Sequence, residues 1–161
     1  MNRRLLVGLA GIGAVSAYAS LMAVQALVFD PLAAVPGSTL AQIHGELRNA
    51  GNDVTRDITS ILVAAAIGFS LAIATAALGL RRRLSPLVMI EIFLAILTLG
   101  GVVAWGSGFA LGMDIADTYM TTGGDHTGWA GVLYVTSLVS LITLAVVAVR
   151  AALRSRSMQA A

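Results

Sequence analysis

The chain has 161 residues, of which 58% are hydrophobic and only 11% are charged, and its formal net charge is +2. This composition excludes a soluble globular domain, in which about 25% of residues are charged, and it lacks the basic stripe that binds nucleic acid. The chain contains neither cysteine nor lysine, which excludes disulfide exchange, thioether-linked haem, cysteine lipidation and a Schiff-base cofactor.

Four long apolar stretches predict four transmembrane helices, because each is near or above the roughly 20 residues that cross a bilayer as an α-helix. The spans are expected at residues 5–29, 58–80, 87–112 and 127–150, with outer loops at 30–57 and 113–127. No loop has room for a further domain, so residues 1–161 are expected to form one. The sequence therefore predicts an all-α integral membrane protein with four antiparallel transmembrane helices.

The charged residues divide between the two ends of this predicted bundle. Eight of the ten arginines flank the inner ends of the spans: Arg3, Arg4, Arg81, Arg82, Arg83, Arg150, Arg154 and Arg156. Seven of the eight acidic residues lie in the outer loops: Asp30, Glu46, Asp53, Asp57, Asp114, Asp117 and Asp125. Because positive residues hold flanking segments in the cytoplasm, we expect a multi-pass protein of a bacterial plasma (inner) membrane with both termini cytoplasmic.

The first predicted span has a competing interpretation as a secretory signal. Its start, Met1 to Val15, is followed by Ala17-Tyr18-Ala19, which imitates a cleavage site. The apolar stretch continues to Phe29, too long for a signal core, so we expect a true span. Asp30-Pro31 is expected to end this span, because proline disfavours a helical backbone at the residue before it.

The loop after this span is expected to contain a short amphipathic helix on the outer surface. Ser38 is a plausible N-cap. Apolar residues then recur at helical spacing: Leu40, Ile43, Leu47 and Val54. Gly51-Asn52-Asp53 provides a stop and then a new N-cap, which predicts a break before the second span. A continuous helix from Ser38 to Leu80 is the alternative.

Small residues recur at four-residue spacing in the second and third spans. They are Ala64, Gly68 and Ala72 in the second span, and Gly100, Ala104 and Gly108 in the third. In lipid, such ridges let helices approach closely and gain van der Waals contact. We expect the ridges to seal the bundle of one subunit, and the alternative is that a ridge receives a helix of another subunit.

Glu91 is the only charged residue at membrane depth. It follows the short turn between the second and third spans, where Ser85-Pro86 is expected to cap the third helix. A bare carboxylate in hydrocarbon is costly, so an acid at this depth is a functional hypothesis by default. Three roles stay open: an ion pair with the Arg81–Arg83 turn, pairing with a basic group of another subunit, and handling of protons or ions.

The outer loop after the third span gathers three acids and a histidine: Asp114, Asp117, Asp125 and His126. Gly123-Gly124 would let the chain turn the last two back toward the first two. Carboxylates with an imidazole can hold a divalent cation, but a solvated, hydrogen-bonded loop is the plainer interpretation. No other cofactor is expected, because neither histidine lies within a span to ligate haem.

Residues at membrane depth do not predict a membrane protease. Ser107 has no histidine in a span to activate it, and only one acid lies in a span. We expect a non-catalytic accessory or assembly subunit of a larger respiratory, transport or envelope-synthesis complex, in contact with lipid and with other transmembrane subunits or further copies of itself. A small homo-oligomeric ion- or proton-coupled carrier or an extracytoplasmic cation-binding protein is the first alternative, and a lipid-modifying enzyme is the second.

Overall fold

The computed structural model describes the backbone of residues 3–159 and the side chains of residues 3–150. Every regular element in this part of the chain is a helix. Four helical runs are long and apolar enough to cross a membrane, as predicted: Arg3–Ala34, Val54–Arg81, Pro86–Tyr119 and Gly128–Arg150. The side chains of Arg154 and Arg156, which the sequence places among the inner arginines, lie outside the described residues.

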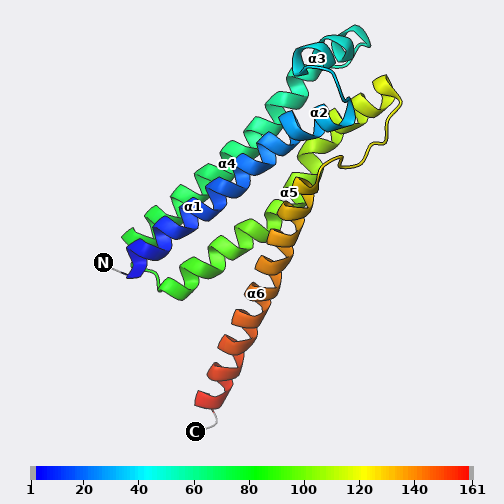
Figure 1. Ribbon diagram of the computed structural model, residues 1–161. Helices are drawn as coiled ribbons and strands as arrows, with labels where there is room; N and C mark the ends of the chain where they lie inside the picture. Colours follow the sequence, from blue (N-terminus) through cyan, green and yellow to red (C-terminus); the bar gives the residue numbers. More distant parts are fainter. Residues whose placement is uncertain (1–2, 160–161) are drawn as a thin grey trace.

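The helices form an elongated bundle that opens at one end (Figure 1). In chain order they are α1 (Arg3–Val24), a π-helical turn (Gln25–Phe29), α2 (Asp30–Ala34), α3 (Leu40–Asn49), α4 (Val54–Arg81), α5 (Pro86–Tyr119) and α6 (Gly128–Gln159). α1 lies beside α4, and α6 packs on α5 before it diverges from α1 and α4 toward the C-terminus. We call the end with α3 the outer end and the end with the α4–α5 turn the inner end.

The first helical run does not stop near Phe29, as the sequence analysis predicted, but continues to Ala34. Pro31 lies in the first turn of α2, directly after the π-helical turn, where the N–H of Asp30 bonds to the carbonyl of Gln25. In an α-helix, a proline ring clashes with the carbonyl four residues earlier. The wider π-turn moves that carbonyl away, so the helical path passes the proline instead of ending there.

The short amphipathic helix is confirmed as α3, with one correction to its start. Thr39, not Ser38, is the N-cap, because Thr39 and Gln42 each bond the other's backbone N–H through their side chains. The predicted break is also confirmed: α3 ends at Asn49, and the Asp53 side chain caps the start of α4. A continuous helix from Ser38 to Leu80 is therefore wrong.

α5 extends further toward the outer end than predicted. It begins at Pro86 with Ser85 as its N-cap, in agreement with the sequence, but it ends at Tyr119 rather than at residue 112. Residues 113–119 of the predicted loop are therefore helical. Ile115 and Ala116 in this stretch are buried, and their packing favours the additional turns.

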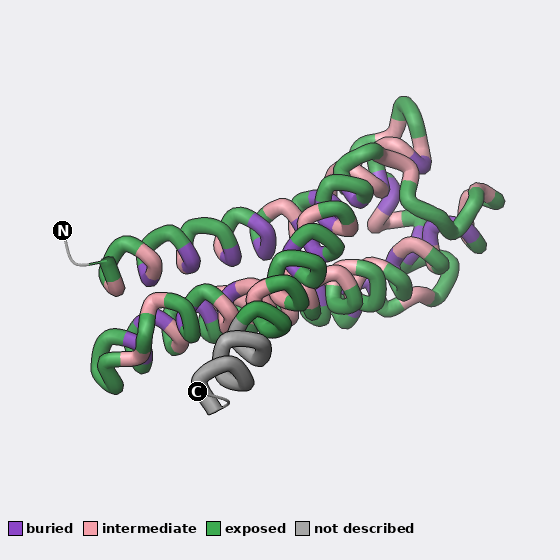
Figure 2. Tube along the Cα trace, turned by 90° about the horizontal axis from the view of Figure 1, so that it is seen from below, coloured by how far each residue is buried: buried purple, intermediate pink, exposed green. Residues whose placement is uncertain are grey.

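The described residues form three small cores along the bundle. The outer core joins α2, α3, α4 and α5 and includes Leu47, which is fully buried. The middle core joins Tyr18 of α1 to Leu133 of α6, and the inner core includes Phe93 of α5. No residue from 141 to 150 is buried, and Figure 2 shows exposed positions along much of this part of α6.

The small residues predicted as packing positions lie against α1 or near it. The three glycines lie against α1 or the π-helical turn that follows it: Gly68, Gly100 and Gly108. A Cβ atom at Gly100 would come within 2.7 Å of the Tyr18 ring of α1. At Gly68 it would lie 3.4 Å from Ala19 of α1, and at Gly108 it would lie 3.5 Å from Ala26 of the π-helical turn. Ala72 is fully buried, and Ala64 and Ala104 border the middle core. These contacts all form within one chain.

Gly11 provides a direct test of the contact between α1 and α5, because a Cβ atom there would overlap the Phe93 ring. We expect Gly11→Ala to destabilise the protein by about 1–3 kcal/mol through overpacking, measured as a lower thermal midpoint in detergent. Gly13→Ala is the matched control, because a Cβ atom at Gly13 meets nothing within 4 Å and alanine favours the helix. Equal midpoints for the two variants would contradict this contact.

Candidate functional site

The structure does not bring the four predicted cation ligands together. The carboxyl of Asp114 on α5 interacts with that of Asp57 on α4, and Asp117 is exposed. Asp125 and His126 belong to a separate network described below. Among the described residues, no group of three or more histidine or acidic side chains is arranged to hold a metal ion. The extension of α5 causes this separation, because it keeps Asp114 and Asp117 on a helix while Asp125 and His126 lie in the loop that follows.

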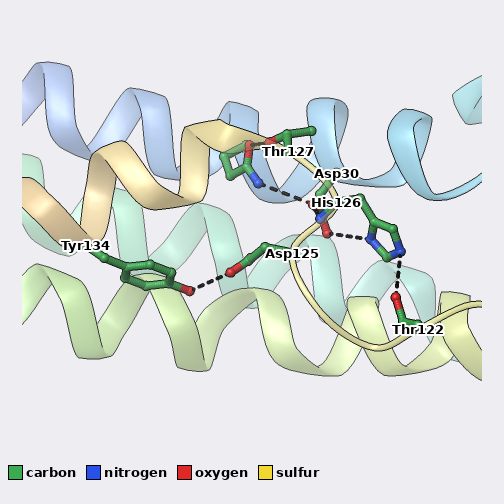
Figure 3. A network of polar contacts seen from close by, with 7 residues as sticks. Asp30, Thr122, Asp125, His126, Thr127 and Tyr134 are labelled. Atoms are coloured by element: carbon green, nitrogen blue, oxygen red, sulfur yellow. Dashed lines mark hydrogen bonds and ion pairs between the residues drawn. The ribbon is translucent and has the colours of Figure 1, made fainter.

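A polar network that the sequence did not predict ties the π-helical turn to the start of α6 (Figure 3). Gln25 is only 4% exposed. Its side-chain nitrogen donates to Asp30 Oδ1 at 3.3 Å, and its side-chain oxygen accepts from Thr127 Oγ1 at 2.7 Å. The backbone N–H of His126 donates to the same Asp30 oxygen at 2.6 Å. Residues far apart in the sequence are therefore joined at the outer end.

The ring of His126 extends this network into the loop before α6. Its Nε2 lies 3.3 Å from Thr122 Oγ1, and its Nδ1 lies 3.7 Å from Asp30 Oδ2. The second distance is too long for a hydrogen bond, and Nδ1 is buried with no hydrogen-bond partner among the described residues. Figure 3 shows the ring between Asp30 and Thr122. The loop is therefore held at its end and along its length.

Gln25 is the residue of this site that the sequence analysis missed. It is an amide in an otherwise apolar stretch, and it lies six positions before Pro31. Buried amides need hydrogen-bond partners, and π-helical turns occur frequently at functional sites. An isolated amide near the end of a predicted span, with a proline just beyond that end, was therefore the available signal.

A cavity of about 100 Å³ lies beside the network, between the end of α1, α5 and α6. Its polar lining consists of Gln25, Asp30, Asp125 and Tyr134, and its apolar lining includes Trp105 and Phe109. The Tyr134 hydroxyl donates to Asp125 Oδ2 at 3.1 Å. No arginine is among the lining residues. The cavity wall therefore carries two carboxyl groups and no basic residue from the described part of the chain.

A second hollow of about 270 Å³ is an apolar groove bordered by α1, α4 and α5. Three of the predicted packing residues line it: Ala64, Gly68 and Gly100. Tyr18 also lines it, but its hydroxyl is hydrogen-bonded to Ser137 Oγ at 2.9 Å. The groove offers apolar contact and no reactive group.

Glu91 is half-buried near the inner end of α5. Within the described part of the chain it forms no ion pair with the Arg81–Arg83 turn, whose three arginines are exposed. It also accepts no hydrogen bond from another described residue. The ion pair that the sequence analysis considered is therefore absent here, and the other two roles remain predictions.

Comparisons with known proteins do not assign the chain to a family. No family model matches the sequence, and no significant match was found among curated proteins or solved structures. The function proposed below therefore rests on the chemistry of the described residues.

We expect the Gln25–Thr127 hydrogen bond to stabilise the folded protein measurably. We expect Gln25→Leu to cost about 1–3 kcal/mol, because Thr127 and Asp30 lose a buried partner. The double variant with Thr127→Val should cost less than the sum of the single variants, with a coupling of about 0.5–1.5 kcal/mol in reversible unfolding. Thr143→Val is the control, because that hydroxyl donates to Val139 of its own helix. If the losses of unfolding free energy in the two single variants added up fully in the double variant, this hydrogen bond would not contribute to stability.

His44 of α3 should make stability depend on pH. Burial, and then the nearby Arg48 cation, lower the pKa of His44 below its ordinary value of 6.5. The unfolded chain therefore binds the proton more tightly, so this stability is fully present above pH 6.5 and is lost as the pH falls toward the lowered pKa. We expect the thermal midpoint of His44→Gln to change less with pH than that of the wild type between about pH 7.5 and 5. A wild-type midpoint no more sensitive to pH than the variant's would contradict this.

Proposed function

We propose that the chain is a multi-pass protein of a bacterial plasma (inner) membrane, with four antiparallel transmembrane helices and cytoplasmic termini. The four long apolar helices, which expose leucine, isoleucine and valine along their length, support insertion into lipid. The contacts of Gly8 with Ala76 and of Gly68 with Ala19 support opposite directions for α1 and α4. The exposed Arg81–Arg83 turn supports a cytoplasmic inner end.

In that membrane, the chain serves as a non-catalytic accessory or assembly subunit of a larger complex. The incomplete packing of α6 is the observation that carries this proposal. Its outer half buries Ala130, Leu133, Ser137 and Ser140, whereas no residue from 141 to 150 is buried. Close packing drives helix association in lipid, because burial of apolar surface from water is not available there. A span that lacks packing over its inner half is suited to dock on another membrane protein.

Two serine hydroxyl groups within the helices make structural contacts, which supports the non-catalytic role. Ser107, which was considered above as a protease nucleophile, donates to the Ala104 carbonyl of its own helix at 3.4 Å. Ser137 donates to the Leu97 carbonyl of α5 at 2.8 Å. Serine hydroxyls bonded in this way stabilise helices and their contacts.

Glu91 supports the same proposal from the inner end. Its carboxylate is half-buried and pairs with no basic side chain in the described part of the chain. An acid at this depth gains most from a charged partner that is itself shielded from water. A basic side chain of an associated subunit would supply that partner.

Copurification tests this proposal. A full-length chain with an affinity tag, extracted from its native membrane in a mild detergent, should retain a larger membrane protein in stoichiometric amount. A clean monomer or homo-oligomer under these conditions would refute the accessory role.

Tryptophan substitution should locate the docking face on the inner half of α6. Ala145 is exposed there, so Ala145→Trp should leave the thermal midpoint of the isolated chain unchanged. We expect it to lower the yield of copurified partner at least about fivefold, equivalent to about 1 kcal/mol. Ala74→Trp, at an exposed inner position of α4, is the matched control and should retain the partner. Equal retention by the two variants would contradict docking through α6.

A further inference from the structure

The cavity of about 100 Å³ beside the Gln25 network, which we call the outer cavity, has walls that attract a cation. Asp30 and Asp125 both line it, and no arginine is among its lining residues. Tyr134 donates to Asp125, and the charges of both acids act on its hydroxyl group. A positive group is therefore favoured inside the cavity, and an anion is disfavoured.

Both carboxylates are held in place and keep one oxygen available. Asp30 Oδ1 accepts from Gln25 Nε2 and from the His126 backbone, whereas its Oδ2 accepts no hydrogen bond from the described residues and has only the 3.7 Å contact with His126 Nδ1. Asp125 likewise accepts from Tyr134 through Oδ2 and leaves Oδ1 open among the described residues. Gln25, which fixes Asp30, is itself buried and bonded on both sides of its amide. The two open oxygens thus lie on a preorganised wall.

The remainder of the wall is apolar and partly aromatic. Trp105 and Phe109 both line the cavity, and their ring centroids lie 5.5 Å apart. Aromatic faces attract cations, particularly alkylated ammonium groups, which lose little hydration on binding. Met22 and Leu133 add aliphatic surface. The lining therefore suits a ligand that combines positive charge with hydrocarbon.

A bare metal ion fits these walls less well. Calcium takes six to eight oxygen ligands, and magnesium demands a near-ideal octahedral set. The cavity offers two carboxylates, and the described residues contain no group of three or more potential metal ligands. An ammonium group needs only two or three acceptors and contact for its carbon atoms.

We propose that the outer cavity binds an alkylammonium group, carried either by a small soluble amine or by the headgroup of an aminophospholipid. The amino group donates to the open oxygens of Asp30 and Asp125, and its carbon substituents contact Trp105 and Phe109. The lipid source rests on the membrane topology proposed above, because that topology places the cavity near the level of the outer headgroups. The soluble source requires no membrane.

Calorimetric titration of the full chain in a maltoside detergent tests the site with ethanolamine as the probe. We expect saturable binding that Asp125→Asn weakens at least about tenfold, because a charged acceptor is lost. Gly112 lines the cavity, and a Cβ atom there meets nothing within 4 Å, so Gly112→Val should fold and fill part of the space. It should weaken binding as well. Circular dichroism and size-exclusion profiles verify folding of each variant.

Asp117→Asn is the matched control for charge, because Asp117 is exposed near the same end and does not line the cavity. It should leave binding within about twofold of wild type. Absence of saturable binding to the wild-type chain would overturn the proposal. Equal weakening by Asp117→Asn and Asp125→Asn would also overturn it, because the attraction would then be general to the acidic surface.

Nanodiscs of phosphatidylglycerol with and without phosphatidylethanolamine distinguish the two sources. A headgroup ligand predicts that phosphatidylethanolamine raises the thermal midpoint of wild type and Asp117→Asn but not of Asp125→Asn. A response to soluble ethanolamine alone assigns the site to a free amine. The copurification result is independent of both readouts, so failure of the amine site and failure of the accessory role are distinguishable.

Discussion

The close approach of α1 to α4 and α5 is the constraint on which the rest of the structure depends. Gly100 leaves room for the Tyr18 ring, and Gly11 leaves room for Phe93. Because Tyr18 fits beside Gly100, its hydroxyl reaches Ser137 of α6 at 2.9 Å and fixes α6 at that level. In lipid, where van der Waals contact and interhelical hydrogen bonds hold helices together, α1 thus positions the other three spans.

The bundle is closed by polar contacts at the outer end and incomplete at the inner end. The π-helical turn turns Gln25 toward Asp30 and Thr127, and these bonds join the end of α1 to the start of α6. The same turn forms one wall of the outer cavity. Residues 141–150, the inner part of α6 whose side chains are described, have no comparable attachment, because none of them is buried. The proposed amine site and the proposed docking face therefore lie at opposite ends of the molecule.

Features set by local chemistry were predictable from the sequence, and features set by tertiary contacts were not. The four spans, the caps at Asp53 and Ser85, and the amphipathic α3 follow from composition and short-range spacing. The path through Pro31 and the added turns of α5 depend on packing and on a π-turn. The amide of Gln25 before Pro31 marks this position in the sequence but does not specify the turn. The cation cluster failed to assemble because of the added turns of α5. Gln25 was missed because its partner Thr127 lies 102 residues away.

The position of α6 in the isolated chain decides whether this helix presents a free docking face. The chain contains no cysteine, so pairs of introduced cysteines can carry spin labels without background. Labels at the exposed positions Leu32 and Val132 report the outer end, and labels at Ala10 and Ala148 report the inner end. Pulsed electron paramagnetic resonance should give a short outer distance and a longer inner one. Short distances at both ends would show that α6 completes its own bundle, which would contradict a free docking face.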